Sequence, residues 1–245
     1  MPVDIASLDA AVKDHNPHQQ HQRHDGFHMS RRLRSAPESV RDLRLLGGRL
    51  ALDFVNTLDP RLGPEATEFL RSPADLILWA AHVRLFDAAA SSRVLRQAER
   101  DRNGARRALT VALETREAMF KTFASIAVGR PPARTDLAVI ERAYRIGLRQ
   151  AWLRRRGGEF AWTISPDAQL EAPLWAVTRD AVELLTSPLV ERVRQCPGLG
   201  DCGWLFLDET KNGSRRWCSM EGCGNRVKAR RQGARRVLAR RSEGT

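Results

Sequence analysis

Apolar residues recur at helical spacing through the middle of the chain, and the first clear helix signal starts at residue 72. Ser72 can cap a helix, Pro73 suits the first helical position, and Asp75 favours the positive end of the helix dipole. The following apolar residues fall on one helix face and are Leu76, Trp79, Ala80 and Val83. The pattern therefore predicts an amphipathic helix that begins at Pro73.

Three later stretches show the same helical periodicity. A long helix is predicted over 101–128, because its apolar positions share a face and Gly129 supplies a stop signal. Another helix is predicted from Thr135, as its cap, through Tyr144. A further helix is predicted over about 171–187.

Shorter segments between these helices carry β signals. Trp152 and the apolar run 160–164 flank Gly157-Gly158, which predicts a β-hairpin. The apolar run 45–57 is too short to assign to helix or strand from its pattern. Together these patterns predict an α+β fold that is mostly helical, with a small β-hairpin in its N-terminal domain.

The composition divides the chain into three parts. Residues 1–40 are polar, contain five of the six histidines and are predicted to be a disordered tail. Weak metal binding by these histidines, or translation that starts at Met29, are the alternatives. Residues 43–190 are predicted to form the mostly helical domain, and residues 191–241 a small C-terminal module that contains every cysteine.

Charge is concentrated in the C-terminal module. Of the total net charge of +12, residues 211–245 carry +9 from eleven basic and two acidic residues, which leaves +3 for the first 210 residues. A GC-rich genome explains why arginine outnumbers lysine, but it does not explain this segregation. The segregation indicates an anionic partner for the C-terminal end.

Several function classes lack their sequence signals. No apolar run approaches the roughly 18 residues of a membrane span, and the N-terminus lacks the apolar core of a secretory signal, so the cytoplasm is expected. No P-loop, G-x-S-x-G or H-E-x-x-H motif is found, and no enzyme activity is expected. Asp53 and Asn56 could line a ligand pocket in the first domain, or they could cap and bond backbone.

The cysteines form two close pairs, Cys196 with Cys202 and Cys218 with Cys223. In a reducing compartment such a cluster favours metal ligation over disulfides. Each pair can supply two thiolates from one tight turn, and two such turns complete a tetrahedral structural zinc site. A catalytic zinc is not expected, because four thiolates leave no open position. A redox dithiol, or four unrelated reduced cysteines, are the alternatives.

The residues around the two pairs predict the fold of the module. The run 204–207 is expected to be a strand, 211–213 a turn, and 215–217 the return strand. A helical stretch follows Cys223. This order of knuckle, hairpin, knuckle and helix is treble-clef-like, and bound zinc would supply the folding energy that so small a core lacks.

The motif around the second pair, Cys218-Ser219-Met220-Glu221-Gly222-Cys223-Gly224-Asn225-Arg226, resembles the CGNR zinc finger, which is named for residues 223–226. The resemblance covers about residues 196–231 and includes Phe206-Leu207-Asp208 and the segment 212–218. Upstream, the segment 50–57 resembles the start of the ABATE domain, which commonly precedes this finger in bacteria.

The resemblance implies one structural zinc ion per chain, with Cys196, Cys202, Cys218 and Cys223 as its ligands. It also implies a bacterial, stress-linked transcription regulator that binds DNA. The first pair of the family usually encloses four residues, whereas here it encloses five. The turn at 197–200, Pro-Gly-Leu-Gly, can absorb the additional residue.

Phosphate binding is the preferred interpretation of the basic residues near and beyond the cysteines. The predicted nucleic-acid contacts are Arg215, Arg216, Asn225, Arg226, Lys228, Arg230, Arg231 and Arg235. Arg216 and Arg226 could instead screen the charge of the zinc thiolates, and Asn225 could cap the helix. A solvated cationic face is the alternative for the remaining positions.

The function expected from these observations is a zinc-containing DNA-binding transcription regulator of the cytoplasm and nucleoid. Its N-terminal domain would sense a small-molecule or protein effector, and its finger would contact DNA. A homodimer is expected if recognition is specific, because one finger reads few base pairs. The alternatives are an RNA- or ribosome-associated zinc protein, and an enzyme with an accessory finger.

Overall fold

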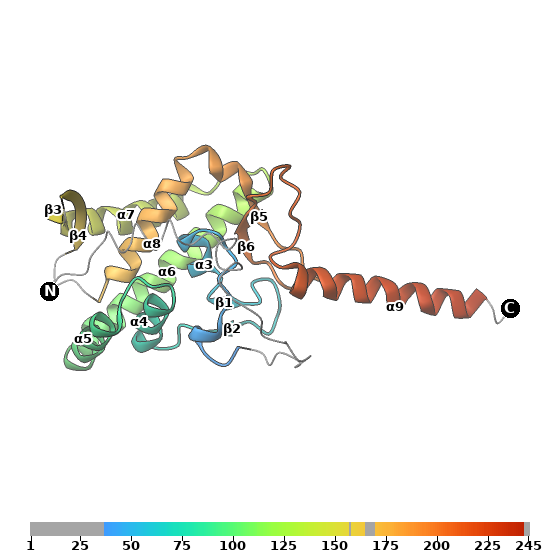
Figure 1. Ribbon diagram of the computed structural model, residues 1–245, viewed down its shortest axis with the longest axis horizontal. Coiled ribbons are helices and arrows are strands. Elements are labelled where there is room, and N and C mark those ends of the chain that lie inside the picture. The colour runs from blue at the N-terminus through green and yellow to red at the C-terminus, as the bar shows by residue number, and fades with distance from the viewer. Residues whose placement is uncertain (1–36, 157, 165–169, 243–245) are drawn as a thin grey trace.

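The computed structural model describes residues 37–156, 158–164 and 170–242 (Figure 1). Its helices are η1 (Val40–Asp42), α3 (Leu50–Val55), α4 (Pro73–His82), α5 (Ala88–Arg100), α6 (Arg102–Ala127), α7 (Arg134–Gln150), α8 (Ala172–Leu185), η3 (Pro188–Arg192), η4 (Met220–Gly224) and α9 (Asn225–Ser242). In this part of the chain the strands form antiparallel pairs, which are β1 (Leu58–Asp59) with β2 (Thr67–Glu68), β3 (Ala151–Arg156) with β4 (Glu159–Ile164), and β5 (Val193–Gln195) with β6 (Leu205–Leu207). The predicted mostly helical α+β fold is confirmed. The predicted His-containing tail lies outside the described residues except for residues 37–40.

The start of α4 has the geometry that its sequence predicts. The Asp75 amide donates to Ser72 Oγ at 3.3 Å, and the Ser72 amide donates back to Asp75 Oδ2 at 2.8 Å. This reciprocal capping box satisfies two amides that the first helical turn leaves without partners. Pro73 occupies the first turn, as predicted. The predicted helices at 101–128 and 171–187 are confirmed as α6 and α8.

The helix predicted from Thr135 through Tyr144 is longer in the structure, and Thr135 lies inside it rather than capping it. α7 begins at Arg134 and continues to Gln150, past the predicted end. The additional turns pack closely on α8, since a Cβ at Gly147 would lie 2.9 Å from the Trp175 ring.

α5 is a further helix that the apolar pattern did not separate from its neighbours. Asp87 caps it by accepting from the Ala90 amide at 2.6 Å.

The short helix α3 lies at the centre of the hydrophobic core. All six of its residues are buried, and α6, α8 and β6 pack against it. The Phe54 and Trp79 rings meet with their centroids 4.9 Å apart. The ambiguous run 45–57 is therefore helical over its central residues. A run that is buried on every side carries no amphipathic period, which is why its pattern did not identify it.

The hydrophobic core continues into the C-terminal module. Val193, Leu205 and Phe206 belong to the same buried cluster as the residues of α3. β5 and β6 pack against α6, and β6 also packs against α3. Figure 1 shows β5 and β6 beside α3, with α9 extending away from the rest of the molecule. Residues 191–241 are thus joined to the helical domain by a common core.

The predicted hairpin at Gly157-Gly158 is confirmed as β3 and β4. Leu153 lies opposite Trp162 in its register. The hairpin carries several exposed apolar side chains, including Phe160, which is 71% exposed. It lies at the opposite end of the molecule from α9 (Figure 1). In the described part of the chain, no helix is long and apolar enough to cross a membrane.

A buried ion pair ties α8 to the start of α3. Arg49 Nη2 lies 2.7 Å from Asp180 Oδ1, and the side chain of Asp180 is fully buried. The Ala51 amide donates to Asp180 Oδ2 at 2.8 Å. Burial raises the pKa of Asp180, and the nearby Arg49 guanidinium opposes that rise. The carboxylate is therefore held by partners that α3 provides.

Replacement of Asp180 by alanine is expected to lower the free energy of unfolding by about 3–5 kcal/mol, because it removes the closest charge partner of Arg49 and leaves the buried Ala51 amide without an acceptor. Urea denaturation measures the decrease. Glu141 pairs with Arg145 on the exposed face of α7, and Glu141→Gln is the control, with an expected change below about 0.5 kcal/mol. Equal decreases in the two variants would show that the Asp180 pair does not organise the core.

Candidate metal centre and basic helix

The four cysteines meet at one point in the structure. Their sulfur atoms all lie within 4.8 Å of one another, and all four residues are buried. Cys218 Sγ lies 3.7 Å from Cys202 Sγ and 3.6 Å from Cys223 Sγ. Sulfur atoms that surround zinc tetrahedrally at about 2.3 Å are separated by about 3.8 Å, so this arrangement fits a tetrathiolate zinc site.

The first pair lies on a turn between β5 and β6. The Cys196 amide donates to Trp204 O at 2.8 Å, and the Gly203 amide donates to Cys196 O at 3.0 Å. Gly198 has a φ of 49°, and a Cβ there would lie 2.6 Å from the Cβ of Cys202. Glycine thus allows the chain to fold back although the pair encloses five residues.

The second pair lies on a turn that leads directly into α9. The Gly222 amide donates to Ser219 Oγ at 3.2 Å, and the Gly224 amide donates to Ser219 O at 3.0 Å. Cys223 belongs to this turn, and α9 begins two residues later at Asn225. The position of the Cys223 sulfur therefore fixes where α9 starts.

The thiols influence one another strongly at these distances. Hydrogen bonds from the neighbouring cysteines lower the pKa of Cys223, and Arg226 Nη2 donates to its sulfur at 3.1 Å. Hydrogen bonds with the same group of cysteines raise the pKa of Cys218. Ionisation of one thiol thus opposes ionisation of the next, and a bound cation would remove this conflict. Arg226 contributes one positive charge beside the cluster, in agreement with the charge-screening alternative for this residue.

The return strand predicted at 215–217 is wrong. β6 pairs instead with β5, with Val193 opposite Leu207 and Gln195 opposite Leu205. Asp208 holds the segment after β6 in a loop, because its carboxylate accepts from the Thr210 amide at 3.0 Å and from the Arg215 amide at 3.0 Å. The hairpin consequently spans the first cysteine pair rather than lying between the pairs.

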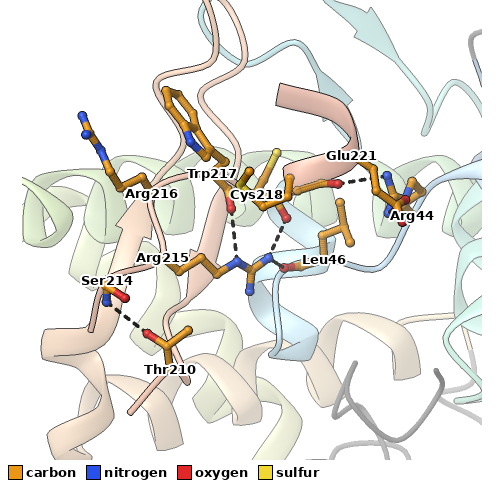
Figure 2. A pocket seen from close by; sticks show the side chains of 11 residues that line it. Arg44, Leu46, Thr210, Ser214, Arg215, Arg216, Trp217, Cys218 and Glu221 are labelled. Atoms are coloured by element: carbon orange, nitrogen blue, oxygen red, sulfur yellow. Dashed lines mark hydrogen bonds and ion pairs between the residues drawn. The ribbon is translucent and has the colours of Figure 1, made fainter. Parts of the chain in front are cut away.

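Arg215, one of the predicted nucleic-acid contacts, points inward. Its guanidinium donates to the carbonyl oxygens of Trp217, Leu207, Leu46 and Cys218, and it lies 4.4 Å from the centre of the Phe206 ring. Figure 2 shows this guanidinium between Leu46 and the second cysteine turn. Arg215 therefore links the module to the segment before α3, and we leave it out of the proposed nucleic-acid surface.

A cleft of about 550 Å³ lies beside Arg215 (Figure 2). Arg44 lines one side and donates to Ser219 Oγ at 3.2 Å, and it also pairs with Glu221 at 3.4 Å. Trp217 and Met220 also line the cleft. The ion pair of Arg44 with Glu221 therefore connects the helical domain to the second cysteine turn.

Asn56 joins α3 to the module through both atoms of its side-chain amide. Its Nδ2 donates to Leu205 O at 2.9 Å, and its Oδ1 accepts from the Leu205 amide at 3.0 Å. Asp53 accepts from the Gly47 amide at 2.8 Å. Both side chains are buried and bond backbone, which is the second of the two interpretations that the sequence allowed.

The loop between β1 and β2 joins the helical domain to the first cysteine turn. The amides of Arg61 and Leu62 donate to the carbonyl oxygens of Cys202 and Asp201 at 2.7 and 3.0 Å. A Cβ at Gly203 would lie 2.5 Å from the Leu62 side chain. The loop thus lies directly against the turn that carries Cys202.

Buried arginines hold this loop in place. Arg61 pairs with Glu117 of α6 at 2.8 Å, and its guanidinium lies 3.7 Å from the centre of the Phe120 ring. Arg116 pairs with Glu68 of β2 at 2.6 Å. The partners lie 48 and 56 residues away in the chain, and no local pattern reveals such pairings.

The other predicted nucleic-acid contacts lie on the surface. Arg216, Asn225 and Arg226 flank the second cysteine turn, and Asn225 Nδ2 donates to Glu221 O at 3.4 Å. The remaining predicted contacts are exposed along α9 and are Lys228, Arg230, Arg231 and Arg235. The structure therefore gathers all of them except Arg215 on one projecting end of the molecule.

Comparison with protein families identifies both parts of the chain. Residues 48–188 match the ABATE family, described as "Putative stress-induced transcription regulator". Residues 192–236 match the CGNR zinc finger. No curated protein matches the chain. Because the ABATE match spans more than half of the sequence, the chain belongs to the ABATE family, and it carries a C-terminal CGNR zinc finger with a four-cysteine metal site.

Replacement of Cys218 by serine is expected to abolish zinc binding and to lower the melting temperature of the whole chain in one cooperative transition. Zinc contributes folding energy on the order of 10 kcal/mol in such modules, and this module shares its core with the helical domain. Elemental analysis and scanning calorimetry measure the two effects. Ser214→Ala, in the exposed loop before Arg215, is the control and should keep both. Zinc retained by Cys218→Ser would contradict the four-sulfur site.

Replacement of Asn56 by leucine is expected to lower the free energy of unfolding. The decrease should be about 1–3 kcal/mol for each of the two Leu205 backbone groups that lose their partner. It should also allow a competing chelator to remove zinc at a lower concentration, since β6 connects the two cysteine pairs. Chelator titration with a zinc-sensitive dye measures this weaker retention. Asn212→Leu, in the exposed turn of the same module, should behave as the original protein. Unchanged zinc retention in Asn56→Leu would show that the two parts are not coupled.

Proposed function

We propose that this protein is a zinc-dependent DNA-binding transcription regulator in which α9 contacts DNA. One zinc ion per chain, held by Cys196, Cys202, Cys218 and Cys223, sets the start and direction of that helix. Binding of this kind would associate the protein with the nucleoid. The ABATE domain supplies the scaffold that holds the finger and the surface through which an effector acts.

The proposed zinc is structural. Four sulfur ligands complete its shell, and their residues are buried between the two turns, so no coordination position remains for a substrate. Ligation of all four sulfur atoms would fix the position of Cys223. It would also fix the position of Asn225, where α9 begins. The metal thereby acts on DNA binding through the placement of a helix.

The exposed charge of α9 is the observation that carries the DNA proposal. The sequence from 222 to 242 holds eight basic residues and no acid, and every side chain from 228 to 236 is exposed. Phosphates attract such a helix in any sequence context, and arginine can also donate two hydrogen bonds to guanine in the major groove. Arg216 and Arg226 extend the cationic surface toward the cysteine turn.

The ABATE domain can influence this surface through two contacts on the finger. Asn56 binds β6, and the loop between β1 and β2 binds the turn of Cys202. An effector that shifts α3 or this loop would therefore move a zinc ligand. In a homodimer, two such helices would read two half-sites, which is the usual route to specificity for small DNA-binding modules.

Replacement of Arg230, Arg231 and Arg235 together by glutamine is expected to weaken duplex DNA binding. The log–log salt slope should become shallower by about 0.9 for each phosphate that the variant no longer neutralises. Fluorescence anisotropy across a salt series measures both the affinity and the slope. The matched control replaces Arg142, Arg145 and Arg149 by glutamine. These three arginines are exposed on α7, so the control removes the same number of positive charges from another surface.

Equal weakening in the two triple variants would mean that overall charge, and not α9, drives binding. Tighter binding of structured RNA than of duplex DNA by the original protein would favour the alternative of an RNA-associated zinc protein.

A further inference from the structure

α9 has little support from the rest of the molecule. Val227 is buried at its first turn, whereas every side chain from 228 to 236 is exposed. The helix extends away from the body over its remaining length (Figure 1). Isolated helices shorter than about 15 residues are marginal in water even when they are rich in alanine, and most helical stability in proteins comes from a packed face. α9 has 18 residues, so its length alone gives it little reserve. The stability of α9 must therefore come from its own sequence or from a partner.

The charges of α9 oppose the helix. Arg226 and Arg230 lie at positions i and i+4 of the helix, as do Arg231 and Arg235. Like charges at this spacing repel. Arg226 has an acidic partner in Asp201, 3.8 Å away, but no acidic residue between 222 and 242 relieves the repulsion between Arg231 and Arg235.

Gly233 weakens the helix further. Glycine is the least favourable residue for a helix interior after proline. A Cβ at Gly233 would meet no atom within 4 Å, so close packing does not require a glycine here. The sequence of α9 thus combines a high positive charge with low intrinsic helix stability.

The cations surround the helix axis. Successive residues turn by about 100°, and the cations before residue 237 point in every direction except one arc that holds Val227 and Ala234; they are Arg226, Lys228, Arg230, Arg231, Arg235 and Arg236. A helix that lies on a membrane separates a broad apolar face from a cationic one. The major groove of duplex DNA instead admits a helix between two rows of phosphates. The cation distribution of α9 fits this groove.

We propose that α9 completes its folding in the major groove of duplex DNA, where phosphates on both walls neutralise the repulsion between its cations. This inference rests on the proposed function, because it requires that α9 is the DNA contact. In the free protein α9 exchanges between helix and unfolded chain, and DNA selects the helix. Part of the binding free energy is spent on this ordering.

The central experiment changes helix stability without changing charge. Gly233→Ala is expected to raise the helix signal of the free protein in circular dichroism and to tighten binding to a 20-base-pair duplex up to about fivefold. Ala234→Gly should have the opposite effects. The double variant Gly233→Ala with Ala234→Gly restores the composition and should bind as the original protein does. Addition of duplex to the original protein should increase its helix signal.

Each outcome separates the inference from the proposed function. If duplex binds, but the helix signal stays constant and Gly233→Ala binds with unchanged affinity, α9 is already folded and the inference is overturned while the proposed function stands. If duplex does not bind, the proposed function itself fails. If vesicles of anionic phospholipid induce the same helix at equal phosphate concentration, the assignment to the major groove is overturned.

Discussion

Four sulfur atoms that converge within 4.8 Å determine how the C-terminal end of this chain is arranged. The turn of Cys196 and Cys202 connects β5 to β6, and the turn of Cys218 and Cys223 leads into α9. One metal ion bound by all four sulfur atoms would hold both turns and would thereby set the direction of α9. The cationic helix has few other contacts that could orient it.

The same cluster is built into the core of the ABATE domain. β6 packs against α3, Asn56 binds both backbone groups of Leu205, and Arg215 reaches back to Leu46. Metal binding would therefore be linked to domain stability and to the placement of α9. The hydrogen bonds between Asn56 and Leu205 connect α3 to β6, which begins three residues after Cys202.

Local signals in the sequence predicted much of this architecture, and long-range pairing accounts for what they missed. The Ser72 cap, the two cysteine pairs and the helix after Cys223 each depend on neighbours within a few residues, and each is found as predicted. Asp208 holds the Arg215 amide, seven positions away, in a loop where a return strand was predicted, and the inward position of Arg215 also depends on Leu46, 169 positions away. The Asn56 contact with Leu205 spans 149 residues, so the residue type alone left its role open.

We propose that metal binding places a cationic helix for DNA. Stepwise withdrawal of zinc with a chelator, with zinc content and duplex affinity measured on the same samples, is the decisive experiment. We expect affinity and its salt dependence to decline in proportion to the zinc that is withdrawn, and both to return when zinc is restored. Metal-free protein that binds the duplex with the original affinity and salt dependence would contradict it.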